Sequence, residues 1–259
     1  MNARSALFDL YGDHLRVRGG RAPVAALVNM LAPLDVAAPA VRTAVSRMVR
    51  QGWLQPERLP SGPGYRLTPR AMRRLDEAAA RIYRTNTPKW DGAWHLILLA
   101  AIPDRTTRDR VRAGLTFLGY APLGDRAWIA AHASSEVATL LENESVSAHT
   151  FSSRLESDAA TLTAEAWDLE ALGRAYQEWH RDAEEIAASA GHDAGDELAF
   201  VVRSRLVHEW RKFLFRDPGL PRALLPAGWP GEQAAKFFDA ETQRLLPGAS
   251  RFVDACLRV

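Results

Sequence analysis

The segment from Pro39 to Leu54, PAVRTAVSRMVRQGWL, does most to limit what this chain can fold into. Proline is favoured in the first turn of a helix, and Gly52 suits the left-handed position that ends one. Four apolar residues recur at helical spacing and so share one face: Val41, Val45, Met48 and Val49. We therefore predict an amphipathic helix that packs one side against a core and exposes the other.

The opposite side of this helix carries positive charge and hydroxyl groups but no carboxylate. Its residues are Arg42, Thr43, Ser46, Arg47 and Arg50. Arginine forms two-pronged hydrogen bonds to guanine or to phosphate, and serine and threonine can serve base edges or phosphates. An ordinary solvated helix usually mixes acids and bases for internal pairing. The absence of acids favours a DNA-reading helix over a merely solvated one.

The flanking elements fit the same interpretation. Two short helices are expected within residues 5–31, and a strand, a turn and a returning strand are expected over Trp53–Gln55, Leu59–Gly64 and Tyr65–Leu67. Three helices followed by a two-stranded wing are the order of a winged helix-turn-helix domain. Arg58 and Arg66 would lie at the base of the wing, within reach of phosphate or the minor groove. Thr68 and Pro69 open a fourth helix.

The charge distribution separates this part from the rest of the chain. The 259 residues carry a net charge of only +2, yet residues 1–89 hold fifteen basic and six acidic residues, a net charge of +9. The remainder holds 18 basic and 25 acidic residues, a net charge of −7. Such asymmetry indicates a region that binds a polyanion, although many basic domains bind nothing anionic.

Several classes of protein are excluded. Cys256 is the only cysteine, so one chain can build neither a disulfide nor a cysteine-based zinc site, and a reducing cytoplasm is the expected location. The longest strongly apolar run, Leu96–Ile102, is far shorter than the roughly 20 residues that cross a bilayer. The first twenty residues lack the apolar core of a secretory signal. We expect no membrane association.

The middle of the chain predicts a small α+β unit. Strands and helices are expected in the order β-α-β-β-α-β between Trp94 and Phe151, which is the order of a ferredoxin-like domain. Asp104 follows the first strand and could be a metal ligand, with Asp91 and Asp109 as the other local acids. The simpler interpretation is that Asp104 opens a turn or caps the next helix. The spacing of the three acids does not resemble that of a metal site.

The acidic C-terminal part is expected to be helical. We predict helices over residues 168–190, 196–215 and 232–246, joined between the last two by a proline-pinned extended segment. In the second helix Arg203 and Arg211 recur with His208 among apolar residues, where polar groups need partners. A structural ion-pair network with Glu209 or Asp217 and a pocket for an anionic ligand are the two alternatives. No catalytic constellation emerges, so an enzyme is not expected.

At this point the chain resembles the PaaX family, the repressors of bacterial phenylacetate catabolism genes. Three blocks carry the resemblance and together span nearly the whole sequence. They are Val41–Leu54 with Tyr65–Thr68, the Trp90/Trp94 region with Ile102–Tyr120, and SRLVHEWRKFLFRDPGLPRALLPAGWPG at Ser204–Gly231. The third block is the most specific of them. The turn at Leu59–Gly64 departs from the family because it lacks the arginine that relatives often carry there.

The resemblance implies three domains: a winged helix-turn-helix at 1–89, a ferredoxin-like domain similar to CRISPR adaptation nucleases at 90–155, and a helical domain at 156–259. It implies a homodimer on palindromic double-stranded DNA, released by an acyl-CoA thioester such as phenylacetyl-CoA. It implies no cofactor. From residue type we place the effector between the central and C-terminal domains, near Arg203, His208, Arg211 and Trp229, where cations would meet phosphates and the indole would stack on a ring.

The leading hypothesis is thus a ligand-gated, dimeric repressor. DNA would be bound by Arg42, Thr43, Ser46, Arg47, Arg50 and Arg66. A metal-dependent nuclease built on the central domain with Asp104 is the alternative from another class, and an acyl-CoA-binding protein that has lost DNA binding is a third.

Overall fold

The computed structural model describes residues 1–84, 90–191 and 193–258, and its helices and strands form two compact units. The first unit combines residues 1–86 with residues 178–211 and 233–259, and the second combines residues 87–177 with residues 212–232. Each unit contains one antiparallel sheet together with helices, which confirms the predicted α+β class. No helix in the described part of the chain is long and apolar enough to span a membrane.

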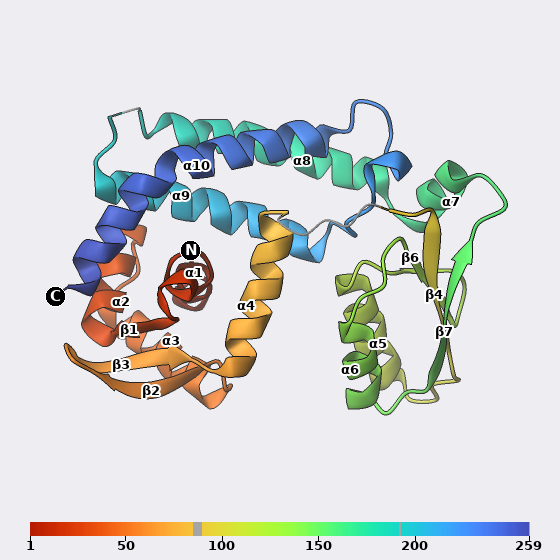
Figure 1. Cartoon of the computed structure of the whole chain (residues 1–259), viewed down its shortest axis with the longest axis horizontal. Coiled ribbons are helices and arrows are strands. Elements are labelled where there is room, and N and C mark those ends of the chain that lie inside the picture. The colour runs from red at the N-terminus through yellow and green to blue at the C-terminus, as the bar shows by residue number, and fades with distance from the viewer. Residues whose placement is uncertain (85–89, 192, 259) are drawn as a thin grey trace. The chain divides into compact units, whose positions relative to one another are not determined.

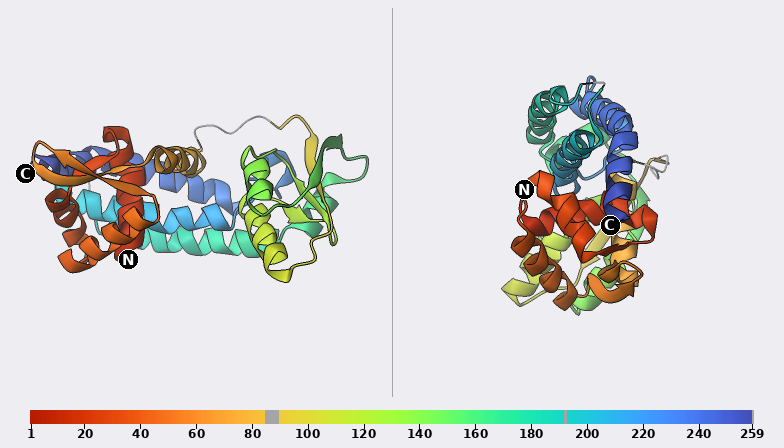
Figure 2. Two further views of the ribbon diagram at one scale, coloured as in Figure 1. Left: turned by 90° about the horizontal axis from the view of Figure 1, so that it is seen from below. Right: turned by 90° about the vertical axis from the view of Figure 1, so that its left-hand side faces the viewer.

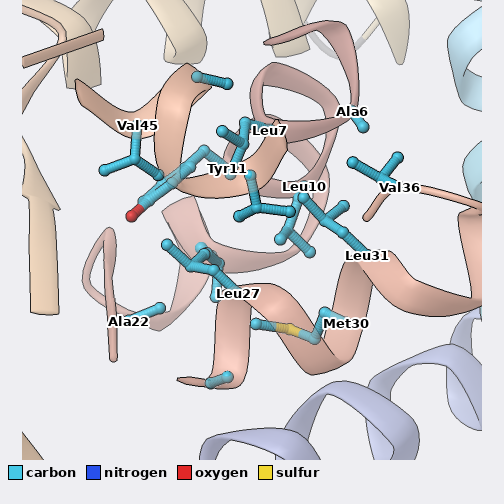
Figure 3. Packing of buried hydrophobic residues seen from close by; sticks show 14 of the residues in the cluster. Ala6, Leu7, Leu10, Tyr11, Ala22, Leu27, Met30, Leu31, Val36 and Val45 are labelled. Atoms are coloured by element: carbon cyan, nitrogen blue, oxygen red, sulfur yellow. The ribbon is translucent and has the colours of Figure 1, made fainter. Parts of the chain in front are cut away.

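The first unit begins with three helices around a shared core. Helix α1 (Ala3–Leu10) is capped by Asn2, and it continues into a π-helical turn, η1 (Tyr11–Leu15), and a 3₁₀ turn, η2 (Arg16–Arg18). Helices α2 (Val24–Leu31) and α3 (Ala38–Arg50) follow, with a 3₁₀ turn, η3 (Ala32–Leu34), between them. Figure 3 shows how side chains such as Leu7, Leu27 and Val45 from the three helices meet in one apolar cluster.

A three-stranded sheet adjoins these helices (Figure 1). Strands β2 (Leu54–Leu59) and β3 (Gly62–Leu67) form a hairpin, and β1 (Arg21–Pro23) pairs with the other edge of β3. Both hairpin strands are longer than the sequence predicts, and β1 is an unpredicted third strand. Helix α4 (Pro69–Ile82) follows, and Thr68 caps it by accepting the Ala71 N–H at 3.2 Å.

The C-terminal helices complete this core, and for that reason residues 1–84, called here the N-terminal module, do not close on themselves. Helices α9 (Asp196–Trp210) and α10 (Pro230–Leu257) contribute four buried residues to the same apolar cluster: Phe200, Ala249, Val253 and Cys256. Two views show the end of α10 beside the N-terminal module (Figures 1 and 2). Helix α8 (Leu169–Ala188) precedes them in the chain.

Helix α10 is longer than predicted. Its end was predicted near residue 246, because proline removes a backbone donor and clashes with the preceding turn. In the structure the helix passes through Pro247, whose own side chain is exposed, and continues to Leu257. Leu245 on one side of the proline and Ala249 and Val253 on the other are all buried. Burial on both sides of Pro247 therefore outweighs the local cost of the proline.

The second unit is built on a four-stranded sheet of order β5-β6-β4-β7. Its elements follow one another as β4 (Ala93–Leu99), α5 (Arg105–Phe117), β5 (Ala121–Pro122), β6 (Ala127–Ala130), α6 (Glu136–Asn143) and β7 (Ala148–Arg154). Helices α5 and α6 cover one face, where Ile97 packs with Val111, Leu115 and Leu141 (Figure 1). Every predicted element of the middle region is present in the predicted order.

The other face of that sheet carries Trp94, which is buried. This face is covered by helix α7 (Ala159–Ala166) and by the segment around Leu220 and Leu224. Helix α7 was not predicted from the sequence. A 3₁₀ turn, η4 (Arg211–Phe215), precedes the proline-pinned segment, and a second, η5 (Arg222–Leu224), lies within it. The second helix of the C-terminal part therefore changes from α9 to a 3₁₀ turn at Arg211 instead of continuing to residue 215. The division into domains 1–89, 90–155 and 156–259 stays a prediction.

Candidate nucleic-acid interface

Helix α3 has two chemically distinct faces. Val41, Ala44, Val45 and Met48 are buried against the core, as the apolar spacing predicts. The predicted DNA-binding residues of this helix are all exposed together on its other side: Arg42, Thr43, Ser46, Arg47 and Arg50. Core packing thus fixes which side of α3 faces outward, and that side contains no acid.

The arginines of this face remain available to an external partner. Among the described residues, no ion pair or side-chain hydrogen bond involves Arg42, Arg47 or Arg50. Thr43 differs, because its hydroxyl donates to the Pro39 carbonyl at 2.9 Å, and this leaves mainly its acceptor lone pairs for an outside group. The face therefore offers the hydroxyl of Ser46 and three guanidinium groups that the described part of the chain leaves unpaired.

Arg66 lies apart from α3, exposed on the central strand β3. It is directly opposite Arg21 of β1, so the two strands bring two arginines together. Arg21 also approaches Glu57 at 3.7 Å across the sheet. Arg21 was not predicted, because β1 has only three residues and ends in a proline, which gives no strand pattern to detect. Arg58 is exposed on β2, as expected for the base of a wing.

The predicted effector residues Arg203, His208 and Arg211 are found in ion pairs. Arg203 donates two hydrogen bonds to Asp13, from Nε at 2.9 Å and from Nη2 at 2.7 Å. His208 Nδ1 lies 2.6 Å from Asp9 Oδ2, and Arg211 pairs with the same carboxylate. An ion-pair network is thus present, and it includes Asp9 of α1 and Asp13 of η1, two acids that were not predicted.

The electrostatics of Asp13 follow from these contacts. Burial alone would raise the pKa of its carboxyl, but the charges of His14 and Arg203 and hydrogen bonds from Arg203 and Tyr83 lower it to about 2. Burial and the neighbouring Asp13 raise the pKa of Tyr83 well above its usual value, so its hydroxyl stays protonated and donates to Asp13. No pattern in the sequence could pair residues so far apart in the chain.

Trp229 belongs to the second unit, whereas Arg203, His208 and Arg211 belong to the first. Its indole is buried and meets the Tyr176 ring edge-on, with ring centroids 6.2 Å apart. A Cβ added to Gly231 would lie 2.5 Å from the indole Nε1, so this glycine is required for the close packing. The described contacts of Trp229 are those of a core residue.

Asp104, the candidate metal ligand of the nuclease alternative, caps helix α5. Its carboxylate accepts the Thr107 N–H at 2.6 Å, and hydrogen bonds from Thr107 lower the pKa of this carboxyl. Asp91 accepts the Ala93 N–H at 2.9 Å, and Asp109 lies 3.8 Å from Arg105. Within residues 1–84, 90–191 and 193–258, no three His, Cys, Asp or Glu side chains gather so as to hold a metal ion. The nuclease alternative gains no support from this geometry.

Comparison with known proteins agrees with the resemblance found in the sequence. Three family models match consecutive parts of the chain: "PaaX-like protein" at residues 2–71, "PaaX protein central Cas2-like domain" at residues 87–166, and "PaaX-like protein C-terminal domain" at residues 167–255. A solved structure, the uncharacterized protein Rv0674 from Mycobacterium tuberculosis, superposes with a TM-score of 0.61 at 25% identity. It covers 98% of each chain.

Among curated proteins, the chain is similar to "Transcriptional repressor PaaX" of Escherichia coli (strain K12). The two are 30% identical over 98% of this chain and 83% of that protein. The match covers the N-terminal module, the central sheet and the C-terminal helices alike. With all three models matched in order and a full-length relative at this identity, the chain belongs to the PaaX family.

Proposed function

We propose that this chain is a transcriptional repressor that binds double-stranded DNA in a sequence-specific manner through helix α3. The observation that carries the proposal is the exposed, acid-free face of α3, with two hydroxyl residues and three arginines that form no ion pair with any described residue. Phosphate contacts would hold the helix in place, and arginine and serine would read base edges in the major groove. The relative from Escherichia coli is a transcriptional repressor, which agrees with this assignment.

The arrangement of elements supports a finer proposal for the fold. Helices α1 to α3 followed by the β2–β3 hairpin fit a winged helix-turn-helix, with α3 as the recognition helix and Arg66 on the wing. The sheet order β5-β6-β4-β7 with α5 and α6 on one face fits a ferredoxin-like layout. A homodimer would place two copies of α3 in successive major grooves, about 34 Å or a multiple of it apart.

The regulated genes and the signal follow from family resemblance. We assign the chain to an aromatic-acid catabolic operon of the phenylacetate type, acting in the cytoplasm, with an acyl-CoA thioester such as phenylacetyl-CoA as the effector. Of the predicted effector residues, Arg203 supports such a role best, because it lines a cavity of about 560 Å³ in the first unit. That volume lies within the range typical of small-molecule sites.

A binding assay tests the proposal. Fluorescently labelled DNA from upstream of the protein's own gene is titrated with protein, beside a scrambled duplex of equal length and composition. We expect tight binding to the natural duplex alone, and release when phenylacetyl-CoA is added. Equal affinity for the two duplexes would contradict sequence-specific repression, and a complex unaffected by a panel of CoA thioesters would contradict the effector class.

A further inference from the structure

A buried polar network joins the N-terminal module to the C-terminal helices within the first unit. Arg203 of α9 holds Asp13 of η1 by two hydrogen bonds, and its Nη2 lies 3.1 Å from the hydroxyl of Tyr83, which follows α4. Nη1 of the same guanidinium donates to the Thr242 carbonyl of α10. One side chain of α9 therefore connects four elements: η1, α4, α9 and α10.

Because it is buried, the Arg203–Asp13 pair cannot be partly broken. The side chains of Arg203 and Asp13 are 5% and 4% exposed, so neither can turn to water while the other stays in place. A buried ion that loses its partner is strongly destabilising, so the pair is either made or replaced as a whole. Asp13 is also presented by a π-helical turn, a conformation that is rare and often found at functional sites.

The cavity noted above is bounded in part by Arg203, the cation of this pair. It is lined by Tyr83, Arg203, Asp239, Ala240, Thr242, Gln243 and Leu246. Two of these residues, Tyr83 and Arg203, donate hydrogen bonds to Asp13. The lining carboxylate, Asp239, is already paired with Arg84. Arg203 is therefore the group that a negatively charged ligand in the cavity would reach, and Asp13 is the anion with which it would compete.

We propose that a small molecule carrying a carboxylate or a phosphate binds in this cavity and replaces Asp13 as the ion-pair partner of Arg203. Loss of the Arg203–Asp13 pair then releases the N-terminal module from α9 and α10. The inference rests on the proposed function, because DNA binding is what release of the module changes. Binding replaces one anion by another at Arg203, so that exchange alone adds little affinity. The net affinity must come from further contacts, for which the lining residues Thr242 and Gln243 are available. Couplings of this kind typically change affinity by about 5- to 150-fold.

Three variants separate the two parts of the proposal. Asp13→Asn keeps the shape of the side chain but removes the charge that Arg203 holds, so it imitates the opened state. Ala240→Trp blocks the cavity from an exposed position and leaves the pair intact. Asp196→Asn is the matched control, because Asp196 pairs with Arg251 and so also joins α9 to α10, but on the surface and without the N-terminal module.

Hydrogen exchange of the DNA-free protein reports the opening directly, and operator affinity reports its consequence. The probes are phenylacetyl-CoA, coenzyme A and phenylacetate, which separate a phosphate-bearing ligand from a carboxylate. We expect at least one probe to speed exchange of the amides of residues 11–15 in the wild type. Asp13→Asn should show the fast exchange without any probe, with operator affinity reduced about 5- to 150-fold. In Ala240→Trp these amides should exchange slowly with or without a probe. In Asp196→Asn their exchange and the operator affinity should equal those of the wild type.

Three results would overturn the inference while the repressor function stands. The first is wild-type exchange and operator affinity in Asp13→Asn. The second is a full response of Ala240→Trp to a probe that releases wild-type protein from DNA. The third is a wild type whose exchange no probe alters. If Asp13→Asn fails to fold, the response of Ala240→Trp to the probes, compared with that of the wild type, still tests the inference. Because exchange is measured without DNA, absence of operator binding by the wild type would count against the proposed function alone.

Discussion

Arg203 and Asp13 lie 190 positions apart in the sequence and form a two-pronged ion pair in the core of the first unit. The pair links the first turns of the chain to its second-last long helix, α9. Apolar packing acts in the same direction, since Phe200 of α9 and Val253 of α10 belong to the core of the N-terminal module. The DNA-binding face on α3 is therefore supported by residues from the far end of the chain.

Replacing Arg203 tests how much this link contributes to stability. Arg203→Met leaves the Asp13 carboxylate buried without its main partner, so we expect the free energy of unfolding to fall by about 3–5 kcal/mol. Urea unfolding followed by circular dichroism measures it. Arg251→Met is the control, because its ion pair with Asp196 is exposed and should contribute at most about 1 kcal/mol. Equal losses in the two variants would show that burial of the Arg203 pair is unimportant.

The stability of the protein should depend on pH through His14. Burial lowers the pKa of this side chain below its usual value, and Asp13, Arg203, Arg18 and Asp254 are the charged groups around it. Below about pH 6.5 the His14 imidazole is therefore protonated in the unfolded chain but not in the folded chain. The contribution of His14 to the free energy of unfolding is fully present above about pH 6.5 and is lost as the pH falls. The slope approaches about 1.4 kcal/mol per pH unit for one proton.

The variant His14→Gln isolates this contribution. Between pH 6.5 and pH 5 the Asp13 carboxyl, whose pKa is about 2, stays ionised in the folded protein and adds no slope of its own. We expect the free energy of unfolding of His14→Gln to depend less on pH in this window than that of the wild type. Parallel curves for the two proteins would show that His14 does not titrate differently on folding.

Gly64 allows β1 and β2 to approach closely to β3, the strand that carries Arg66. A Cβ at this position would lie 2.6 Å from Leu59 Cδ1 and 2.7 Å from the backbone oxygen of Ala22, so β1, β2 and β3 would have to move apart. We expect Gly64→Ala to destabilise the protein by about 1–3 kcal/mol in thermal or urea unfolding. Gly191→Ala is the matched control, since a Cβ there meets nothing within 4 Å. A stable Gly64→Ala variant would contradict the register of this sheet.

The absence of acids on α3 should matter as much as its arginines. Ser46→Glu places a carboxylate among exposed guanidinium groups without touching the core, so folding should be unaffected. Repulsion from DNA phosphates should weaken binding at least about tenfold, since like charges across an interface cost several kcal/mol. Gln233→Glu, also exposed but on α10, controls for the change in net charge. Unchanged operator affinity in Ser46→Glu would place the DNA elsewhere.

Local patterns explain what could be predicted from the sequence. The apolar spacing of α3 fixes its buried face, and so the five exposed residues of its outer face follow from the pattern alone. The alternation of strands and helices between Trp94 and Phe151 likewise suffices for the order of the central elements. In both regions the periodicity of a single segment decides which residues are buried.

Features that depend on distant segments could not be predicted in this way. Strand β1 exists because β3 offers it a pairing edge, and α10 continues past Pro247 because its two sides are buried. The acids that pair with Arg203 and Arg211 come from α1 and η1, and no local spacing indicates them. The same limit affects the predicted effector site, whose arginines and histidine lie in the first unit while Trp229 lies in the second.

The most direct test of DNA reading by α3 is the affinity of Arg47→Ala for the upstream duplex and for single-base variants of it, at several salt concentrations. If Arg47 reads a base, the matched site should lose about 1–3 kcal/mol of binding free energy, and discrimination at one position should disappear. A uniform loss with a shallower salt dependence would make Arg47 a phosphate contact on the same helix face. Wild-type affinity and specificity in Arg47→Ala would contradict the assignment of α3 as the recognition helix.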